Sequence, residues 1–222
     1  LTTIVSPIHT VFLPTMASFW NKGQKNEITG YVTHIIRLSA LITLPFFAII
    51  VVLGEPILQF LTQQVLITET KSFIIISLSF AIFGFGIPLG DILVVAGKSK
   101  NLFFLNGILA ALNFILNLLV IPSWGITGAA VSTVICHSAY TIFSFHLARS
   151  VIPFSLPANN LFKTILSSSI TGFFVFFLSK NFQQNIFIEI LLGITLYVAL
   201  LFIFKIVGKK DADYIRNLLR IN

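Results

Sequence analysis

Residues 112–133 read LNFILNLLVIPSWGITGAAVST, two apolar stretches joined by the connection Pro-Ser-Trp-Gly at positions 122–125. Proline lacks a backbone N–H donor, and glycine adopts the positive φ values that a sharp reversal requires. We therefore predict that Pro122 ends one apolar helix and that the next begins directly after Gly125. A link this short makes the two helices antiparallel neighbours.

The composition of the whole chain agrees with a membrane environment. Of its 222 residues, 56% are hydrophobic and 9% are charged, and the mean hydropathy is +0.99. Soluble domains carry about 25% charged residues. This composition excludes a soluble globular domain and a disordered chain, and it predicts an all-α, polytopic transmembrane helical bundle.

Apolar runs define the predicted spans. One partial and six full runs are present, at residues 1–20, 38–53, 73–96, 102–121, 126–147, 162–178 and 186–207. We predict a transmembrane lobe over 1–208, followed by a cytoplasmic amphipathic tail over 209–222. Residues 55–66 are ambiguous and are interpreted as an interfacial continuation of the preceding helix. Because the first run is already in progress at Leu1, we interpret the chain as the C-terminal portion of a longer protein.

The basic residues alternate between connections. The chain carries 14 Lys and Arg against seven Asp and Glu. Twelve of the 14 fall in alternate connections and the tail, and two, Lys71 and Lys180, in the others. Positive residues stay in the cytoplasm, so the twelve mark the inner side and the C-terminus is predicted to be cytoplasmic. Because they lie between apolar runs, these residues indicate membrane topology and not nucleic-acid binding.

Several short motifs, in order along the chain, resemble one transporter superfamily. They are Pro14-Thr15-Met16-Ala17, Gly54-Glu55-Pro56-Ile57-Leu58, Gly97-Lys98-Ser99-Lys100 and the 112–133 segment. Together they resemble the polysaccharide flippases of the multidrug/oligosaccharidyl-lipid/polysaccharide exporter superfamily. Residues 61–64 depart from the pattern, because the family often has a Phe-Gly turn there.

The resemblance implies a two-lobed bundle around a central cavity, of which this chain is the C-terminal lobe. Family members flip undecaprenyl-diphosphate-linked sugars outward by alternating access. The resemblance thus implies the bacterial cytoplasmic membrane, a lipid-linked oligosaccharide as substrate, and contact with membrane lipids and a polysaccharide polymerase.

One polar stripe is the main candidate for the substrate cavity. Thr133, His137 and Thr141 recur every four residues and therefore share one helix face. A His in mid-membrane faces protein or water, so His137 either lines a cavity that holds sugar or diphosphate or makes an interhelical hydrogen bond. His9 is a weaker candidate of the same kind. Arg37, at a cytoplasmic edge, is the nearest cation for a diphosphate.

Other spacings favour helix packing. Gly128, Ser132 and Cys136 recur every four residues and form a small-residue face suited to close helix contact. Asn113 and Asn117 share a face, where their amides can bond across helices.

Asp91 is the only acid well inside an apolar run, and it follows a segment rich in Gly and Pro. It either couples transport to a proton or sodium ion, or pairs with Lys98 or Lys100 near the inner interface. We favour the ion pair.

No motif for catalysis or for a cofactor is present. The chain lacks paired acids, a His-rich metal spacing, a P-loop and a nucleophile elbow. We therefore expect no enzyme activity, no cofactor and no metal. Two alternatives to flipping remain open: a cation-coupled multidrug efflux transporter, which Asp91 favours, and a non-transporting membrane scaffold of a polysaccharide assembly system.

Overall fold

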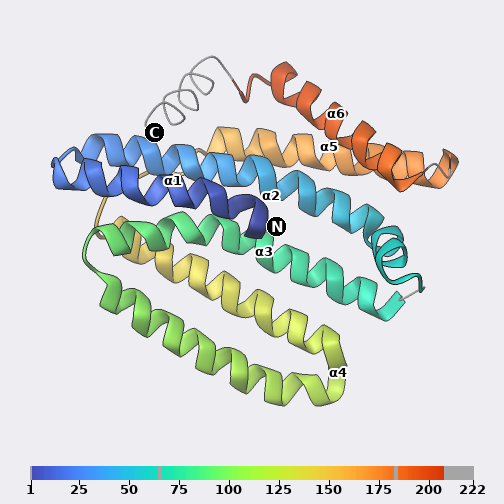
Figure 1. Cartoon of the computed structure of the whole chain (residues 1–222), viewed down its shortest axis with the longest axis horizontal. Helices are drawn as coiled ribbons and strands as arrows, with labels where there is room; N and C mark the ends of the chain where they lie inside the picture. Colours follow the sequence, from blue (N-terminus) through green and yellow to red (C-terminus); the bar gives the residue numbers. More distant parts are fainter. Residues whose placement is uncertain (1, 65–66, 183–184, 208–222) are drawn as a thin grey trace.

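A computed structural model describes residues 2–64, 67–182 and 185–207, and it is helical almost throughout (Figure 1). The helices are α1 (Thr2–Asn21), α2 (Lys25–Thr62), α3 (Ile67–Val95), α4 (Ser99–Arg149), α5 (Ala158–Phe182) and α6 (Ile186–Ile203). Helix α2 lies in the middle of the bundle, with α3 and α4 on one side and α5 and α6 on the other. The predicted tail over 209–222 lies outside the described residues.

Helix α4 is a hairpin of two arms. Its backbone leaves helical geometry at Gly125, where φ is 56° and ψ is −137°, and the second arm runs back beside the first (Figure 1). Our prediction that Pro122 ends the first arm is wrong, because the helix continues through Trp124. Inside α4 the non-helical backbone is at Gly125, so the chain reverses there and not at Pro122.

Helix α2 is much longer than its apolar run. We predicted a span over 38–53, whereas the helix has 38 residues and contains both Pro45 and Pro56. The first turns of α2 are polar and lie at one end of the bundle, so they fall outside the apolar run. The helix ends at Thr62. Residues 55–62 therefore continue the preceding helix, as we interpreted them.

Five helices among the described residues, α2 to α6, are long and apolar enough to cross a membrane. Each arm of α4 exceeds the about 20 residues that a span requires. The first arm is largely uncovered, with Phe103, Leu119 and Trp124 each at least 60% exposed. An apolar surface of this extent fits a bilayer, and the chain is a multi-pass membrane protein.

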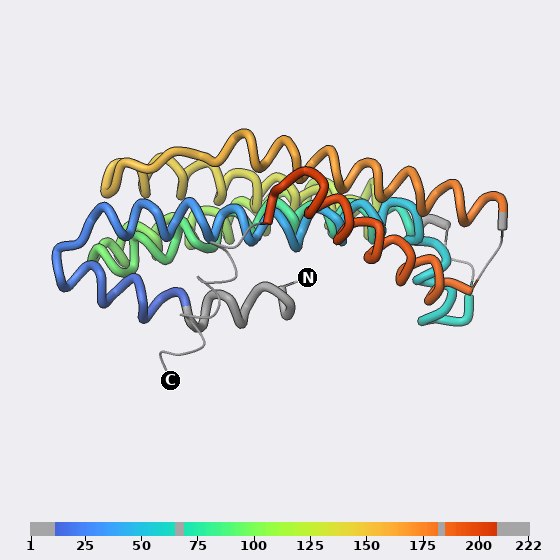
Figure 2. Tube along the Cα trace, turned by 90° about the horizontal axis from the view of Figure 1, so that it is seen from above, coloured from blue at the N-terminus to red at the C-terminus, as the bar shows by residue number. Residues whose placement is uncertain are grey.

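Successive connections lie at opposite ends of the bundle. The α1–α2, α3–α4 and α4–α5 connections are at one end, and Gly125, the end of α2 and the start of α6 are at the other (Figures 1 and 2). Lys22, Lys98 and Arg149 belong to the first group, whereas Lys71 and Lys180 lie toward the second. The fold therefore separates the basic residues as the sequence predicts. Which end is cytoplasmic stays a prediction.

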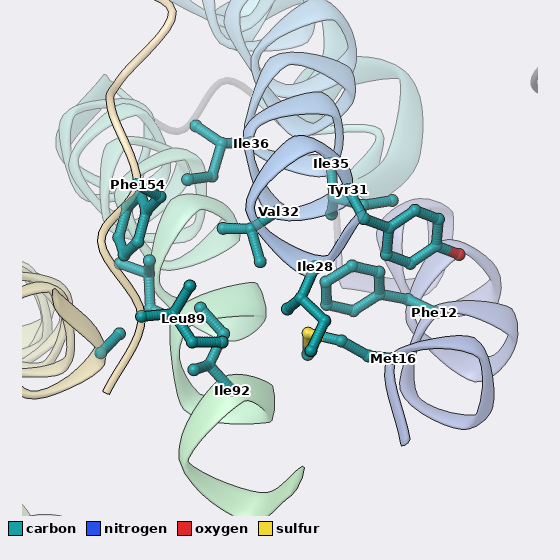
Figure 3. Close-up of a cluster of buried hydrophobic side chains, with 12 residues drawn as sticks. Phe12, Met16, Ile28, Tyr31, Val32, Ile35, Ile36, Leu89, Ile92 and Phe154 are labelled. Carbon is teal, nitrogen blue, oxygen red and sulfur yellow. The ribbon is translucent and has the colours of Figure 1, made fainter. Parts of the chain in front are cut away.

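The main hydrophobic cluster joins α1, α2, α3, the end of α4 and the α4–α5 connection (Figure 3). Phe12 and Met16 of α1 are fully buried against α2 and α3. The ring of Phe12 stacks on Tyr31 with centroids 4.9 Å apart. Phe154, from the α4–α5 connection, is buried in the same cluster. This cluster fixes α1 and the connection against the middle of the bundle.

Candidate functional site

His137 lies between the second arm of α4 and helix α3. Its Nδ1 is 3.3 Å from the carbonyl oxygen of Ser79, and its ring stacks on Phe83 with centroids 4.4 Å apart. When Nδ1 carries the proton and donates to this carbonyl, Nε2 is left as an acceptor. We had interpreted His137 either as a cavity residue or as a residue that makes an interhelical hydrogen bond. The structure contains such a contact, between His137 on α4 and Ser79 on α3.

The two threonines of the predicted stripe have different surroundings. The Thr141 hydroxyl is 3.1 Å from the carbonyl oxygen of Ile82 on α3 and 2.9 Å from that of His137. The Thr133 hydroxyl donates to the carbonyl of Ala129 in its own helix, at 2.9 Å. Thr133 and His137 border one pocket, whereas Thr141 borders a second one between α2, α3 and α4. The structure thus brings together two of the three stripe residues.

The pocket that contains Thr133 and His137, which we call the α3–α4 pocket, has a volume of about 340 Å³. It lies between α3 and the two arms of α4. Its lining residues are Phe83, Asn106, Leu109, Ala110, Asn113, Thr133, Cys136, His137 and Tyr140. None of these described residues is an acid, Lys or Arg, so the pocket combines apolar surface with hydrogen-bonding groups and carries no permanent charge.

Asn106 and Asn113 contribute to the opposite wall of this pocket, together with Leu109 and Ala110. The Asn117 amide nitrogen donates to Oδ1 of Asn113 at 3.0 Å, which leaves the Asn113 amide nitrogen outside that bond. Asn106 was missed at the sequence level although a signal exists. It lies seven residues before Asn113 and eleven before Asn117, a spacing that keeps all three on one helix face.

The small residues of the second arm face the first arm. Gly128, Ser132 and Cys136 are buried. A Cβ atom on Gly128 would lie 2.9 Å from the carbonyl oxygen of Val120, and the Cys136 sulfur is 3.6 Å from that of Leu109. Contact this close has no room for a larger side chain at Gly128.

Helix α3 carries its own small positions opposite Tyr140. A Cβ on Gly86 would lie 2.7 Å from the Thr141 hydroxyl and 2.8 Å from the Tyr140 ring, and one on Gly90 would overlap the Tyr140 hydroxyl. Because these two glycines have no side chain, Tyr140 can pack directly against the backbone of α3. They belong to the Gly- and Pro-rich segment that precedes Asp91.

A second depression lies between α2 and α5, on helices that do not line the α3–α4 pocket. We call this depression the α2–α5 groove. It measures about 610 Å³ and is lined by Leu44, Phe47, Ala48, Val51, Val52, Ile165, Ser168, Ser169, Gly172, Phe173 and Phe176. Arg37 is half-buried and precedes Leu44 by seven residues and Ala48 by eleven. It therefore shares their face of α2, two turns toward the basic end.

Two acids complete the candidate groups. Asp91 is half-buried near the end of α3 and close enough to Tyr140 for an electrostatic interaction. Glu189, in the first turn of α6, is only 3% exposed. Sequence reasoning passed over Glu189 because it stands near the start of its apolar run, and only the neighbouring helices show how deeply it is buried. The side chain of His9 lies outside the described residues.

The described residues contain no group of three or more His, Cys, Asp or Glu that could hold a metal ion. The candidate groups for a ligand are the hydrogen-bonding side chains of the α3–α4 pocket and Arg37, on the α2 face that lines the apolar groove. This arrangement is suited to binding an amphiphilic molecule.

Comparisons with known proteins agree with this fold. The MatE family model matches residues 3–119. A curated relative from Haloferax volcanii, named "Probable low-salt glycan biosynthesis flippase Agl15", is 24% identical over 223 residues, which cover 96% of this chain and 45% of the relative.

Among solved structures, "Lipid II flippase MurJ, inward closed conformation" superimposes with a TM-score of 0.73 at 20% identity. The match covers 86% of this chain and 42% of that structure. The chain therefore spans less than half the length of each of these proteins.

Proposed function

Because this chain belongs to the MatE family, we propose that it forms one lobe of a membrane transporter for lipid-linked oligosaccharide. The transporter flips an undecaprenyl-diphosphate-linked glycan across the bacterial cytoplasmic membrane for polysaccharide biosynthesis, beside a polysaccharide polymerase. The names of the two relatives, a glycan biosynthesis flippase and a lipid II flippase, support this substrate class.

The observation that carries the proposal is that Arg37 lies on the face of α2 that lines the α2–α5 groove, two turns before Leu44. A lipid diphosphate combines a dianionic head with a long apolar tail. The groove offers an apolar surface for the tail, and Arg37 offers a guanidinium that can bind phosphate oxygens in a bidentate way. Because Leu44 and Ala48 share the Arg37 face of α2, head and tail can be held along a single helix.

The orientation of the lobe follows from the basic residues. With the basic end of the bundle in the cytoplasm and the C-terminus inside, Arg37 lies in the inner part of α2. A lipid diphosphate entering from the inner leaflet would meet it first. The second lobe, which the lengths of the relatives imply, closes the transport cavity, and alternating access moves the head outward.

Binding of undecaprenyl diphosphate to the full-length protein tests this proposal. We expect Arg37→Gln to weaken binding about tenfold, because one charge-assisted contact contributes about 1.5–3 kcal/mol. Ser169→Trp, which fills the groove from an exposed position, should weaken it as well. Lys71→Gln and Leu166→Trp are the matched controls, since neither residue lines the groove. Unchanged affinity in both test variants, with wild-type thermal stability, would contradict the proposal.

Cation-coupled multidrug efflux is the second candidate, and the half-buried carboxyl of Asp91 favours it. In that case an organic cation such as ethidium should bind the full-length protein and undecaprenyl diphosphate should not compete with it. Asp91→Asn should then abolish ethidium binding. Under our proposal the lipid binds, and Asp91→Asn leaves its affinity unchanged.

A further inference from the structure

The α3–α4 pocket is distinct from the α2–α5 groove and offers different chemistry. The groove has a mainly apolar lining, with Arg37 two turns away on the same face of α2, whereas the pocket combines hydrogen-bonding groups with aromatic rings and no permanent charge. The two depressions also involve different helices, so no helix lines both. They are therefore suited to different parts of a ligand, or to different ligands.

The polar atoms of the pocket include both donors and acceptors. The contact of Nδ1 with Ser79 leaves Nε2 of His137 as an acceptor, and Thr133 keeps its oxygen lone pairs while it donates to Ala129. The Asn113 amide nitrogen is a donor outside its bond with Asn117. A ligand hydroxyl both donates and accepts, so several hydroxyls on one ring match this set.

The apolar part of the pocket has a matching shape. Phe83 lines the pocket and holds the His137 ring at 22° to its own plane. One face of Phe83 is covered by the His137 ring, so the two rings together form an aromatic border beside which the C–H groups of a pyranose can pack, while neighbouring polar groups meet its hydroxyls. The volume of about 340 Å³ is near the lower end for ligand pockets, which indicates one or two sugar units.

Because the described lining of the pocket carries no charged residue, the pocket suits the neutral sugar of the proposed substrate better than its diphosphate. A diphosphate held here would lack a cation among the described lining residues, and an organic cation would lack a carboxylate. Either charge would be buried without compensation inside the membrane, at a cost of several kcal/mol. A neutral polyol avoids this penalty.

We infer that the α3–α4 pocket is a carbohydrate subsite that binds one or two neutral sugar units through His137, Asn113 and Asn106 against the Phe83 ring. This rests on the proposed function, because the sugar is that of the lipid-linked glycan. In the sequence analysis His137 was a candidate ligand for sugar or for diphosphate, and this inference assigns it to sugar alone. Thr141 is not part of the subsite, because it borders a different pocket.

The test compares two probes on the full-length protein: undecaprenyl diphosphate, and the same lipid carrying N-acetylglucosamine. We expect the wild type to bind the sugar-bearing lipid about tenfold more tightly than the bare one, which is about 1.4 kcal/mol. His137→Phe retains the ring stack and removes both nitrogens, and it should lose this preference while its affinity for the bare lipid stays unchanged.

Asn106→Leu is the second test variant, because Asn106 lines the pocket from an exposed position on the first arm. Asn106→Leu should lose the preference for the sugar-bearing lipid and keep wild-type thermal stability. It therefore tests the inference even if His137→Phe disturbs folding. Asn101→Leu, on the same arm and outside the pocket, is the matched control and should keep it.

The outcomes separate the two proposals. A wild type without preference for the sugar-bearing lipid, or a preference that survives in both test variants, would overturn the carbohydrate subsite and leave lipid binding intact. A folded wild type that binds neither lipid would contradict the proposed function itself.

Discussion

The hydroxyl of Tyr197 in α6 donates a buried hydrogen bond to the carbonyl oxygen of Leu41 in α2, 2.8 Å away. In a regular helix that carbonyl accepts from the N–H of the residue four positions later. Here that residue is Pro45, which has no N–H. Tyr197 therefore satisfies the carbonyl that Pro45 leaves open, and it joins α6 to one of the two points, at Pro45 and Pro56, where a proline removes an internal bond of α2.

Removing the Tyr197 hydroxyl should destabilise the protein only while Pro45 is present. We expect Tyr197→Phe to lower the free energy of unfolding by about 1–3 kcal/mol, since it leaves a buried carbonyl without a donor. In a Pro45→Ala background the backbone N–H gained at position 45 takes over, so the same change should have little effect. Unfolding of the four proteins in detergent measures the coupling, expected to equal most of that loss, about 1–3 kcal/mol. Equal losses in the two backgrounds would show that the bond does not compensate for the proline.

Enlarging Gly86 or Gly90 should disrupt the contact between α3 and α4. Gly90→Ala places a methyl group on the Tyr140 hydroxyl and Gly86→Ala crowds Thr141, and overpacking of this kind costs about 1–3 kcal/mol. Gly107→Ala is the matched control, because no neighbour lies within 4 Å of its Cβ position, and it should be neutral or stabilising. Thermal unfolding in detergent compares the three variants. A Gly90→Ala protein as stable as Gly107→Ala would mean that the helices do not approach as described.

Lys163 should stabilise the end of α6. Its ammonium donates to the carbonyl of Phe204 at 3.2 Å, where α6 ends, and a cation at a helix C-terminus contributes about 0.3–1 kcal/mol. Lys163→Met should therefore lower the melting temperature and speed hydrogen exchange at the end of α6. Lys180→Met, at the opposite end of α5, should do neither. Identical exchange in the two variants would argue against the capping role.

Cysteine labelling tests which end of the bundle is cytoplasmic. In a Cys136→Ser background we expect a membrane-impermeant maleimide to label Ser123→Cys in intact cells, and to label Ser99→Cys only after lysis. The reason is the excess of Lys and Arg at the end of the bundle that holds Ser99. Labelling of position 99 but not 123 in intact cells would invert the orientation.

Hydropathy and turn chemistry predicted most of the fold. The apolar runs marked the helices, and Gly125 marked the reversal inside α4, because these signals are local. The full length of α2 was not predictable in this way. The predicted span of 38–53 already contained Pro45, but the missed parts of α2, residues 25–37 and 54–62, lie outside the apolar run.

The candidate site was predictable only in part. Four-residue spacing placed Thr133 and His137 on one face, and both border the α3–α4 pocket. The same spacing could not show that Thr141 turns toward α3, that Asn106 completes the opposite wall, or that Glu189 is buried. Those properties depend on which helices become neighbours.

Transport by the full-length protein tests the central claim most directly. Reconstituted in vesicles with undecaprenyl-diphosphate-linked N-acetylglucosamine, it should bring the sugar of lipid from one leaflet within reach of an impermeant sugar-modifying enzyme on the other side. The rate should fall about tenfold or more in Arg37→Gln, the loss expected of one charge-assisted contact, and stay at the wild-type level in Lys71→Gln. Sugar exposure no faster than in protein-free vesicles, from a folded wild-type protein, would contradict the account.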